Sequence, residues 1–257
     1  MIEPAPNQSS GSRIVSRILP PAIRFWLRTQ VDDVKDLTFR IEGRDRDILV
    51  GHIPEVWLSA QKAIYQGLHL SHIAVKATDI RINLGQVVRR KPLRLLAAFP
   101  VSGDVRVTLD DLNASLQSPL LGEGIYQFLK LIAKSQPEST DLTPLLARFP
   151  EGTILPQYRP TADIEADTIT LRLMPSDPQS GPEIAIATSL TIRDGNRLCL
   201  ENPRWLSSEQ TDAAITMAAL HGFEINLGSA VTLTECEVQD NHLALAGTIR
   251  VFPPVST

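Results

Sequence analysis

The chain has 257 residues, of which 43% are hydrophobic and 21% are charged. A chain of this length and mixed composition can bury a sizeable core, which excludes disorder of the whole chain. Its formal charge of -4 argues against general nucleic-acid binding, because there is no basic excess to neutralise many phosphates.

The first predicted element is an amphipathic, basic helix within residues 1–34. Apolar residues recur at helical spacing from Ile14 to Val31, with arginines between them, and Pro20 and Pro21 are expected to kink the helix. Two interpretations stay open. Either the helix packs on the sheet, or its apolar side enters a lipid headgroup region while its arginines meet anionic lipid. The membrane-surface candidates are Arg13, Arg17, Ile18, Ile23, Arg24, Trp26, Leu27 and Arg28.

Residues 35–135 form the first predicted half. Apolar residues alternate with polar ones between Leu37 and Leu109, and the stretch from Gly43 to Asp47 is predicted to be a polar turn. Alternation of period two places apolar side chains on one face of a strand. This part therefore predicts an antiparallel meander.

A helix is predicted after the meander, with Asp110 or Asp111 as its N-cap and an end near Lys134. Pro119 and Gly122 are expected to divide it into two pieces. An apolar stripe on this helix, facing an apolar sheet, is typical of an ordinary two-layer core or of the wall of an elongated apolar cavity. The candidate lipid-contacting residues are Leu120, Leu121, Ile125, Phe128 and Ile132.

Residues 136–160 are predicted to be a linker with a short helix near 142–149, and residues 161–257 a second antiparallel half with one helix. In this half, Asp194-Gly195 is typical of a tight hairpin turn. The helix is predicted from Ser207 to His221, followed by two strands from Val231 to Val251.

Two short motifs recur in the same order in both halves. Ile82-Asn83-Leu84-Gly85 returns as Ile225-Asn226-Leu227-Gly228, and Trp57-Leu58-Ser59 returns as Trp205-Leu206-Ser207. This recurrence raises the hypothesis of two related halves. The patterns together predict an α+β fold in which curved antiparallel β-sheets wrap on long helices.

No residue pattern indicates catalysis or a cofactor. The chain has no phosphate-binding glycine loop, nucleophile elbow, zinc-protease helix or kinase signature. Its two cysteines, Cys199 and Cys236, have no second thiol or histidine at metal-ligand spacing. We therefore expect no enzyme, no catalytic residue, no metal and no cofactor.

Segments that direct a chain into or across a membrane are not evident either. No stretch approaches the roughly 18 apolar residues of a transmembrane helix. The polar start up to Ser12 does not match a signal peptide. The expected location is the cytoplasm, with peripheral contact with a membrane as an open question.

Several phrases of the first half stand in a characteristic order. They are Arg17-Ile18-Leu19, Trp26-Leu27-Arg28, Ile41-Glu42-Gly43, Tyr65-Gln66-Gly67-Leu68-His69-Leu70-Ser71, Ile80-Arg81-Ile82-Asn83-Leu84-Gly85, Asp111-Leu112-Asn113-Ala114-Ser115-Leu116 and Ser118-Pro119-Leu120-Leu121. In this order they resemble the cyanobacterial branch of the LmeA-like phospholipid-binding proteins. The resemblance implies phospholipid binding and a tubular lipid-binding-like fold. The better-known members of the family are exported, whereas we expect no export signal in this chain.

The leading hypothesis is a non-enzymatic protein that binds phospholipid or another acyl lipid. Its acyl chains would lie between the apolar sheet face and the helical stripe, since burial of methylenes requires no charged catalytic group. The alternative is a structural or protein-interaction module with a closed core and no lipid ligand. A membrane surface is a candidate partner, nucleic acid is not, and no protein partner is identified.

Overall fold

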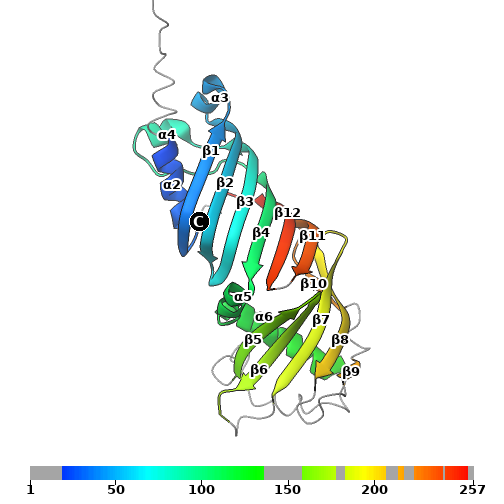
Figure 1. Cartoon of the computed structure of the whole chain (residues 1–257). Coiled ribbons are helices and arrows are strands. Elements are labelled where there is room, and N and C mark those ends of the chain that lie inside the picture. The colour runs from blue at the N-terminus through cyan, green and yellow to red at the C-terminus, as the bar shows by residue number, and fades with distance from the viewer. Residues whose placement is uncertain are drawn as a thin grey trace, which may run out of the picture.

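The computed structural model describes residues 19–135, 158–177, 183–206, 214–216, 223–239 and 241–253. Antiparallel sheets form most of this part, which confirms the expected α+β fold on antiparallel strands (Figure 1). The helices are α2 (Leu19–Thr29), α3 (Asp45–Leu49), α4 (Leu84–Val88), α5 (Leu109–Leu116) and α6 (Pro119–Ser135). The expected long helices are not seen here, since the longest of these, α6, has 17 residues.

The first sheet has six strands in the order β1-β2-β3-β4-β12-β11, and it is curled (Figure 1). Its strands are β1 (Asp33–Glu42), β2 (His52–Tyr65), β3 (Leu68–Arg81), β4 (Phe99–Thr108), β12 (His242–Val251) and β11 (Val231–Gln239). Between β2 and β3, Gln66 and Gly67 both have positive φ, as a tight hairpin turn requires.

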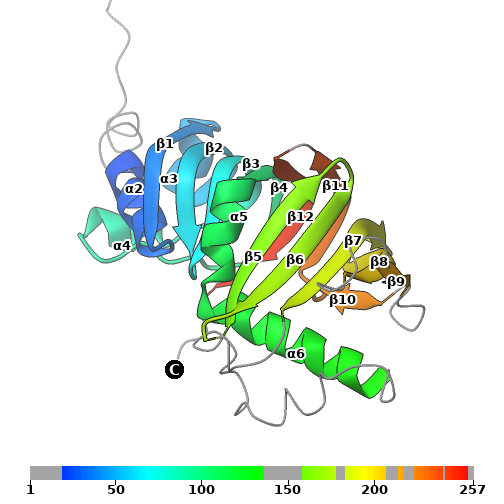
Figure 2. The same ribbon diagram turned by 60° about the horizontal axis from the view of Figure 1, so that its bottom comes forward.

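The second sheet contains β5 (Tyr158–Glu165), β6 (Thr168–Pro175), β7 (Ile184–Arg193), β8 (Arg197–Leu206), β9 (Ala214–Thr216) and β10 (Glu224–Asn226). Its order is β10-β8-β7-β6-β5, with β9 also paired to β8. The predicted turn at Asp194-Gly195 joins β7 to β8, and both residues have positive φ. Figure 2 shows α6 alongside this sheet and α2, α3 and α4 at the opposite end of the molecule.

The C-terminal hairpin does not lie where the sequence places it. The β11–β12 hairpin was expected among the strands of the second half, but β12 pairs with β4 of the first sheet, from Phe99 opposite Val251 to Thr108 opposite His242. This pairing satisfies backbone groups along one whole side of β4 that would otherwise form an open edge. The first sheet is therefore built from both ends of the described chain.

Three local expectations are corrected. Residues 45–49 form α3 rather than a turn, because Ile48 is 2% exposed and holds this segment in the core. Residues 214–216, expected in a helix, form β9, since the edge of β8 offers free backbone partners. The N-cap of α5 is Thr108, whose hydroxyl accepts from the Asp111 backbone N–H, rather than Asp110 or Asp111.

Other expectations lie outside the described residues or differ in structure. The short helix at 142–149 and most of the helix from Ser207 to His221 lie outside the described residues. One recurring motif adopts two conformations, because residues 82–85 lead into α4 whereas residues 224–226 form β10, and the described residues of the other, Trp57-Leu58 and Trp205-Leu206, lie in strands β2 and β8. The two related halves therefore stay a prediction that these motifs do not strengthen.

Helix α5 links the two sheets through side chains of one short segment. On one side, the His69 backbone N–H donates to Ser115 Oγ at 2.7 Å, which joins α5 to β3. On the other side, Asn113 Nδ2 donates to the Ala162 carbonyl at 3.0 Å and Asn113 Oδ1 accepts from the Ala162 N–H at 2.7 Å. Because β5 is an edge strand, Asn113 takes the place of a neighbouring strand.

Substituting Asn113 with alanine is expected to destabilise the protein by about 1–3 kcal/mol, because the polar backbone groups of Ala162 lose their partners. The measurement is the midpoint of urea unfolding. Asp110→Ala, at an exposed position of the same helix, is the control and should change the midpoint little. Equal midpoints for Asn113→Ala and Asp110→Ala would contradict the linking role of Asn113.

Two glycines face each other where the first sheet curls. Gly103 of β4 lies opposite Gly247 of β12. A Cβ on Gly103 would lie 2.1 Å from the Ala74 carbonyl oxygen, and one on Gly247 would lie 2.4 Å from the Thr232 carbonyl oxygen. An irregularity in β11 between Leu233 and Glu235 accompanies them. The close backbone approach and the irregularity are the features that bend a sheet.

Candidate functional site

The apolar stripe predicted on the helix belongs to α6, and most of it packs against the second sheet. Ile125 is 7% exposed and lies in a core with Leu129, Leu173 and Ile184, which we name the second core. Leu121 and Phe128 are half-buried against this core, and the Phe128 ring lies 5.8 Å from that of Phe223.

The outer members of the stripe are placed differently. Leu120 is 48% exposed, so its side chain faces away from the second core. Ile132 lies in α6, but its side chain is outside the described residues. At Ile125 and Leu129 the packing is closed, because Leu129 is 0% exposed. This part of the stripe is therefore core packing between α6 and the second sheet.

An incompletely covered apolar surface lies on the first sheet. The pairing places Ile73, Val105, Leu245 and Cys236 in one row across β3, β4, β12 and β11. Leu58 and Val75 form the next row, which continues through Gly103 and Gly247. All six side chains are half-buried and belong to neither core. We name this surface the apolar band: Leu58, Ile73, Val75, Val105, Cys236 and Leu245.

The apolar band shares its sheet face with the core at the α2 end. Val56 and Ala77 lie in the row next to Leu58 and Val75. They belong to a cluster, the first core, that also contains Leu19 of α2 and Leu84 of α4. At this end residues of α2, α3 and α4 pack against the sheet face, whereas the band beyond it belongs to neither core. This partly covered stretch of the apolar face is therefore the candidate site.

The thiol of Cys236 lies in apolar surroundings on the band. Burial raises the pKa of the Cys236 thiol, which is the direction expected in apolar surroundings where the thiolate is disfavoured. Cys199, by contrast, is 0% exposed in the second sheet. The two cysteines thus differ in accessibility, and Cys236 is the one that lies on the apolar band.

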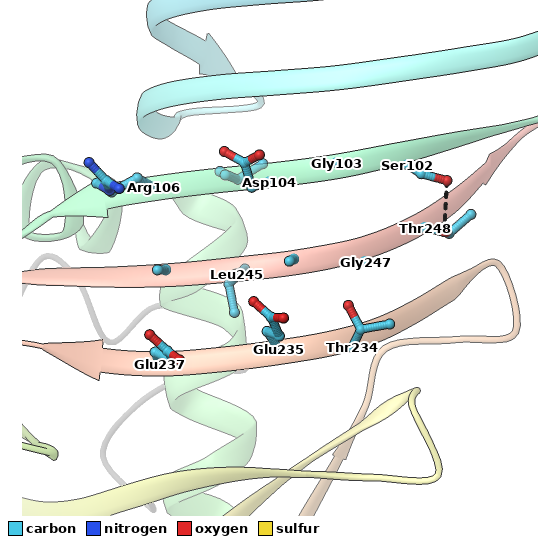
Figure 3. Close-up of a pocket in the computed structure, with 13 residues that line it drawn as sticks. Ser102, Gly103, Asp104, Arg106, Thr234, Glu235, Glu237, Leu245, Gly247 and Thr248 are labelled. Atoms are coloured by element: carbon cyan, nitrogen blue, oxygen red, sulfur yellow. Dashed lines mark hydrogen bonds between the residues drawn. The ribbon is translucent and has the colours of Figure 1, made fainter.

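The opposite face of the same strands carries a hollow of about 610 Å³ that is bordered by charged side chains (Figure 3). Ala244 and Ala246 of β12 form its floor because their side chains are short, and Asp104 and Arg106 of β4 stand along one side. Glu235 and Glu237 of β11 stand along the other side. The sheet therefore separates a face that carries charged side chains, the polar face, from the apolar face.

Charged groups elsewhere on this polar face form exposed pairs. Lys76 lies 2.7 Å from Glu55 and 4.9 Å from the ring centre of Trp57. The hydrogen bond from Lys76 is the largest cause that lowers the pKa of Glu55, and the indole N–H of Trp57 also donates to this carboxylate. Such pairing near the surface stabilises a sheet face modestly.

Within the described segments, no group of three or more histidine, cysteine or acidic side chains is arranged to hold a metal ion. None of the helices in the same segments has the length and apolarity needed to cross a bilayer.

The N-terminal candidates divide between the core and the surface. Ile23 is 7% exposed in the first core, and Trp26 and Leu27 are half-buried against it. Arg24 and Arg28 are exposed, and the Arg24 guanidinium lies 5.6 Å from the ring centre of Phe39. Arg13, Arg17 and Ile18 lie outside the described residues.

The sequence patterns did not identify two features of the candidate surfaces, the exposed Phe25 and the apolar band around Leu245. Phe25 is 71% exposed on α2, but helical periodicity gave no reason to single it out. Leu245 and its neighbours were recognised only as strand residues, because the crossover that brings β12 beside β4 carries no local signal. Alternation within each strand was the available signal for the apolar face, but not for which strands share it.

Comparison with known proteins gives one family. A family model described as LmeA-like phospholipid-binding matches residues 11–248. No curated protein and no solved structure matched the chain. The family match covers the second sheet, the first sheet up to Thr248 in β12, and every residue of the apolar band. It does not distinguish a cyanobacterial branch, which stays a prediction.

Proposed function

Because the chain belongs to the LmeA-like phospholipid-binding family, which supports a lipid-binding role, we propose that it holds phospholipid acyl chains against the apolar band, beside helix α6. The observation that carries this proposal is a row of half-buried apolar side chains that neither core covers. Aliphatic chains are the ligand such a surface favours, since each methylene removed from water contributes about 0.8 kcal/mol.

The dimensions of the band support this ligand. The band crosses five strands, β2, β3, β4, β12 and β11. Strands lie about 4.8 Å apart, so four spacings give about 19 Å. One leaflet of the hydrocarbon core is about 15 Å deep, half of about 30 Å. An acyl chain thus fits across the band. Gly103 and Gly247, which have no side chain, lie beside its centre.

We propose binding without catalysis. Apolar contacts require no nucleophile or general base, and the charged residues next to the band on β4 and β11, such as Asp104 and Glu235, lie on the polar face. Contact with a membrane surface is part of the same proposal. On α2 the groups available for it are the exposed Phe25, Arg24 and Arg28 rather than Ile23.

The test is purification of the whole chain without detergent, followed by lipid extraction and mass spectrometry. We expect phospholipid to co-purify, or to be taken up from phosphatidylcholine vesicles. A chain that contains no lipid and takes up none would contradict lipid binding and favour the closed structural or interaction module.

The location of the lipid is tested by labelling Cys236 with a small maleimide. Bound phospholipid should slow this labelling, and removal of lipid should speed it, because Cys236 lies on the band. Labelling should rise with pH and keep rising above the usual thiol pKa of about 8.5, since burial raises the pKa of Cys236. The Cys236→Ala variant, which retains only the buried Cys199, is the control. Equal rates with and without bound lipid would place the ligand elsewhere.

A further inference from the structure

The segment after β3 is positively charged, although the formal charge of the whole chain is negative. From Arg81 to Gly103 the chain has no acidic residue. Arg89, Arg90, Lys91 and Arg94 lie in this segment, and all four are exposed. None of them forms an ion pair with a described residue. In a chain of formal charge -4, these residues concentrate positive charge that no acidic side chain among the described residues pairs with.

Asn83 holds this basic segment in a fixed shape. Its side chain is 9% exposed, its Nδ2 donates to the Pro92 carbonyl at 3.0 Å, and its Oδ1 accepts from the Arg94 N–H at 2.7 Å. The Asn83 backbone N–H also donates to the Arg94 carbonyl at 3.2 Å. The basic side chains therefore stand on a loop that is tied to the start of α4.

Large apolar side chains are exposed around the same loop. Val88 is 41% exposed at the end of α4, and Leu96 is 61% exposed just after the loop. Val50, after α3, is 82% exposed. The Ile82 N–H donates to the Gly51 carbonyl at 2.8 Å, so the α3 turn lies beside α4. Apolar side chains exposed within a basic surface are typical of a site that contacts a partner.

We propose that this surface, the basic tip, docks the protein on an anionic phospholipid bilayer. The basic tip consists of Val50, Val88, Arg89, Arg90, Lys91, Arg94 and Leu96. Arginine and lysine would meet anionic headgroups while Val50 and Leu96 enter the boundary between headgroups and acyl chains. Figures 1 and 2 place α3 and α4 at the end of the first sheet that lies away from the second sheet, so among the described elements none of the second sheet stands between this end and a flat surface.

Charge complementarity selects a membrane as the occupant. The formal charges at α3 cancel, because Arg44 and Arg46 alternate with Asp45 and Asp47. The net positive charge of the basic tip therefore lies on the α4 side. Residues 81–96 contain no aromatic side chain on which a base can stack. The exposed valine and leucine side chains gain from lipid but not from a phosphate backbone. The inference rests on the proposed function, to which it adds the place of membrane contact.

The experiment is flotation of the full chain with vesicles of phosphatidylcholine alone or mixed with phosphatidylglycerol. We expect binding to the anionic vesicles, weakened by added salt. Arg89→Gln with Arg90→Gln should lower the affinity roughly tenfold or more. Val50→Ser with Leu96→Ser should lower it as well. Each variant is first checked for an unchanged thermal unfolding midpoint.

The matched control is Arg159→Gln with Arg204→Gln, which removes two exposed arginines from the second sheet and should leave flotation unchanged. Phe25→Ser tests α2 in the same assay. Wild-type affinity in both basic-tip variants would overturn the proposal. Binding of an RNA duplex as tight as that of anionic vesicles, lost in the same arginine variant, would overturn it in favour of a nucleic-acid site.

The outcome is separable from that of lipid holding. The basic-tip variants should retain the co-purified phospholipid of the wild type, because the band is untouched. A chain without bound lipid whose flotation still depends on the tip would refute lipid holding but leave the docking site in place. A chain that contains lipid, but whose flotation is the same in the wild type and the basic-tip variants, would support lipid holding and refute the docking site.

Discussion

The double variant Val105→Asn with Leu245→Gln is expected to lose most of its bound phospholipid. The two residues lie opposite each other at the centre of the apolar band, one on β4 and one on β12. A polar amide facing acyl chains loses its water without gaining a partner, which costs about 1–3 kcal/mol for each group. Lipid affinity should therefore fall at least about tenfold, since each 1.4 kcal/mol is a factor of ten. The measurement is phospholipid per protein by mass spectrometry.

The control uses the neighbouring pair on the same strands. Asp104 lies opposite Ala246, and both side chains point to the polar face. Asp104→Asn with Ala246→Gln introduces the same two side chains as the test variant, but away from the band, and should leave lipid content unchanged. Unfolding midpoints measured on both variants separate lost binding from lost folding. Equal lipid loss in both would show that the band is not the site.

Gly103→Ala is expected to be the most destabilising single substitution considered. Its Cβ would lie 2.1 Å from the Ala74 carbonyl oxygen and 2.7 Å from Val75 Cα. Both atoms belong to the backbone of β3, so relief requires the two strands to separate. Overpacking typically costs about 1–3 kcal/mol, and contact with backbone places this substitution at about 3 kcal/mol or more. The measurement is the free energy of unfolding in urea.

Gly124→Ala provides the comparison for this variant. Gly124 lies in α6, and a Cβ there would meet nothing within 4 Å. Alanine in a helix interior should raise the stability by about 0.5–1 kcal/mol, because it restricts the unfolded chain more than glycine does. The two alanine variants are thus expected to change stability in opposite directions. A mild effect of Gly103→Ala would mean that the curl of the first sheet does not depend on close strand approach.

Secondary structure was largely predictable because its signals are local. The alternation of Leu37, Phe39 and Ile41 specified β1, and Asp194-Gly195 specified the β7–β8 turn. The exceptions were decided by burial and pairing elsewhere in the chain. Residues 45–49 were predicted as part of a polar turn but form α3, because the Ile48 side chain is buried in the first core.

The candidate site was only partly predictable. The stripe of α6 was visible as periodicity, and Ile125 indeed faces a sheet. Periodicity does not show whether the side chains at that contact are fully buried, since their burial depends on which sheet packs against α6. The basic segment at Arg89–Arg94 was readable in the sequence but was overlooked, because it lies between predicted elements and the net charge of the chain is negative.

The sequence by itself determined an antiparallel α+β chain, its strands and hairpin turns, and its resemblance to the LmeA-like family. These follow from period-two alternation, turn residues and short ordered phrases, all of which are local. Only the tertiary structure decided that β12 returns to β4, that Asn113 completes the edge of β5 and that the apolar band is only partly covered. Backbone pairing between strands carries no side-chain signature, so residues 140 or more positions apart, such as Val105 and Leu245, are brought together only by the fold.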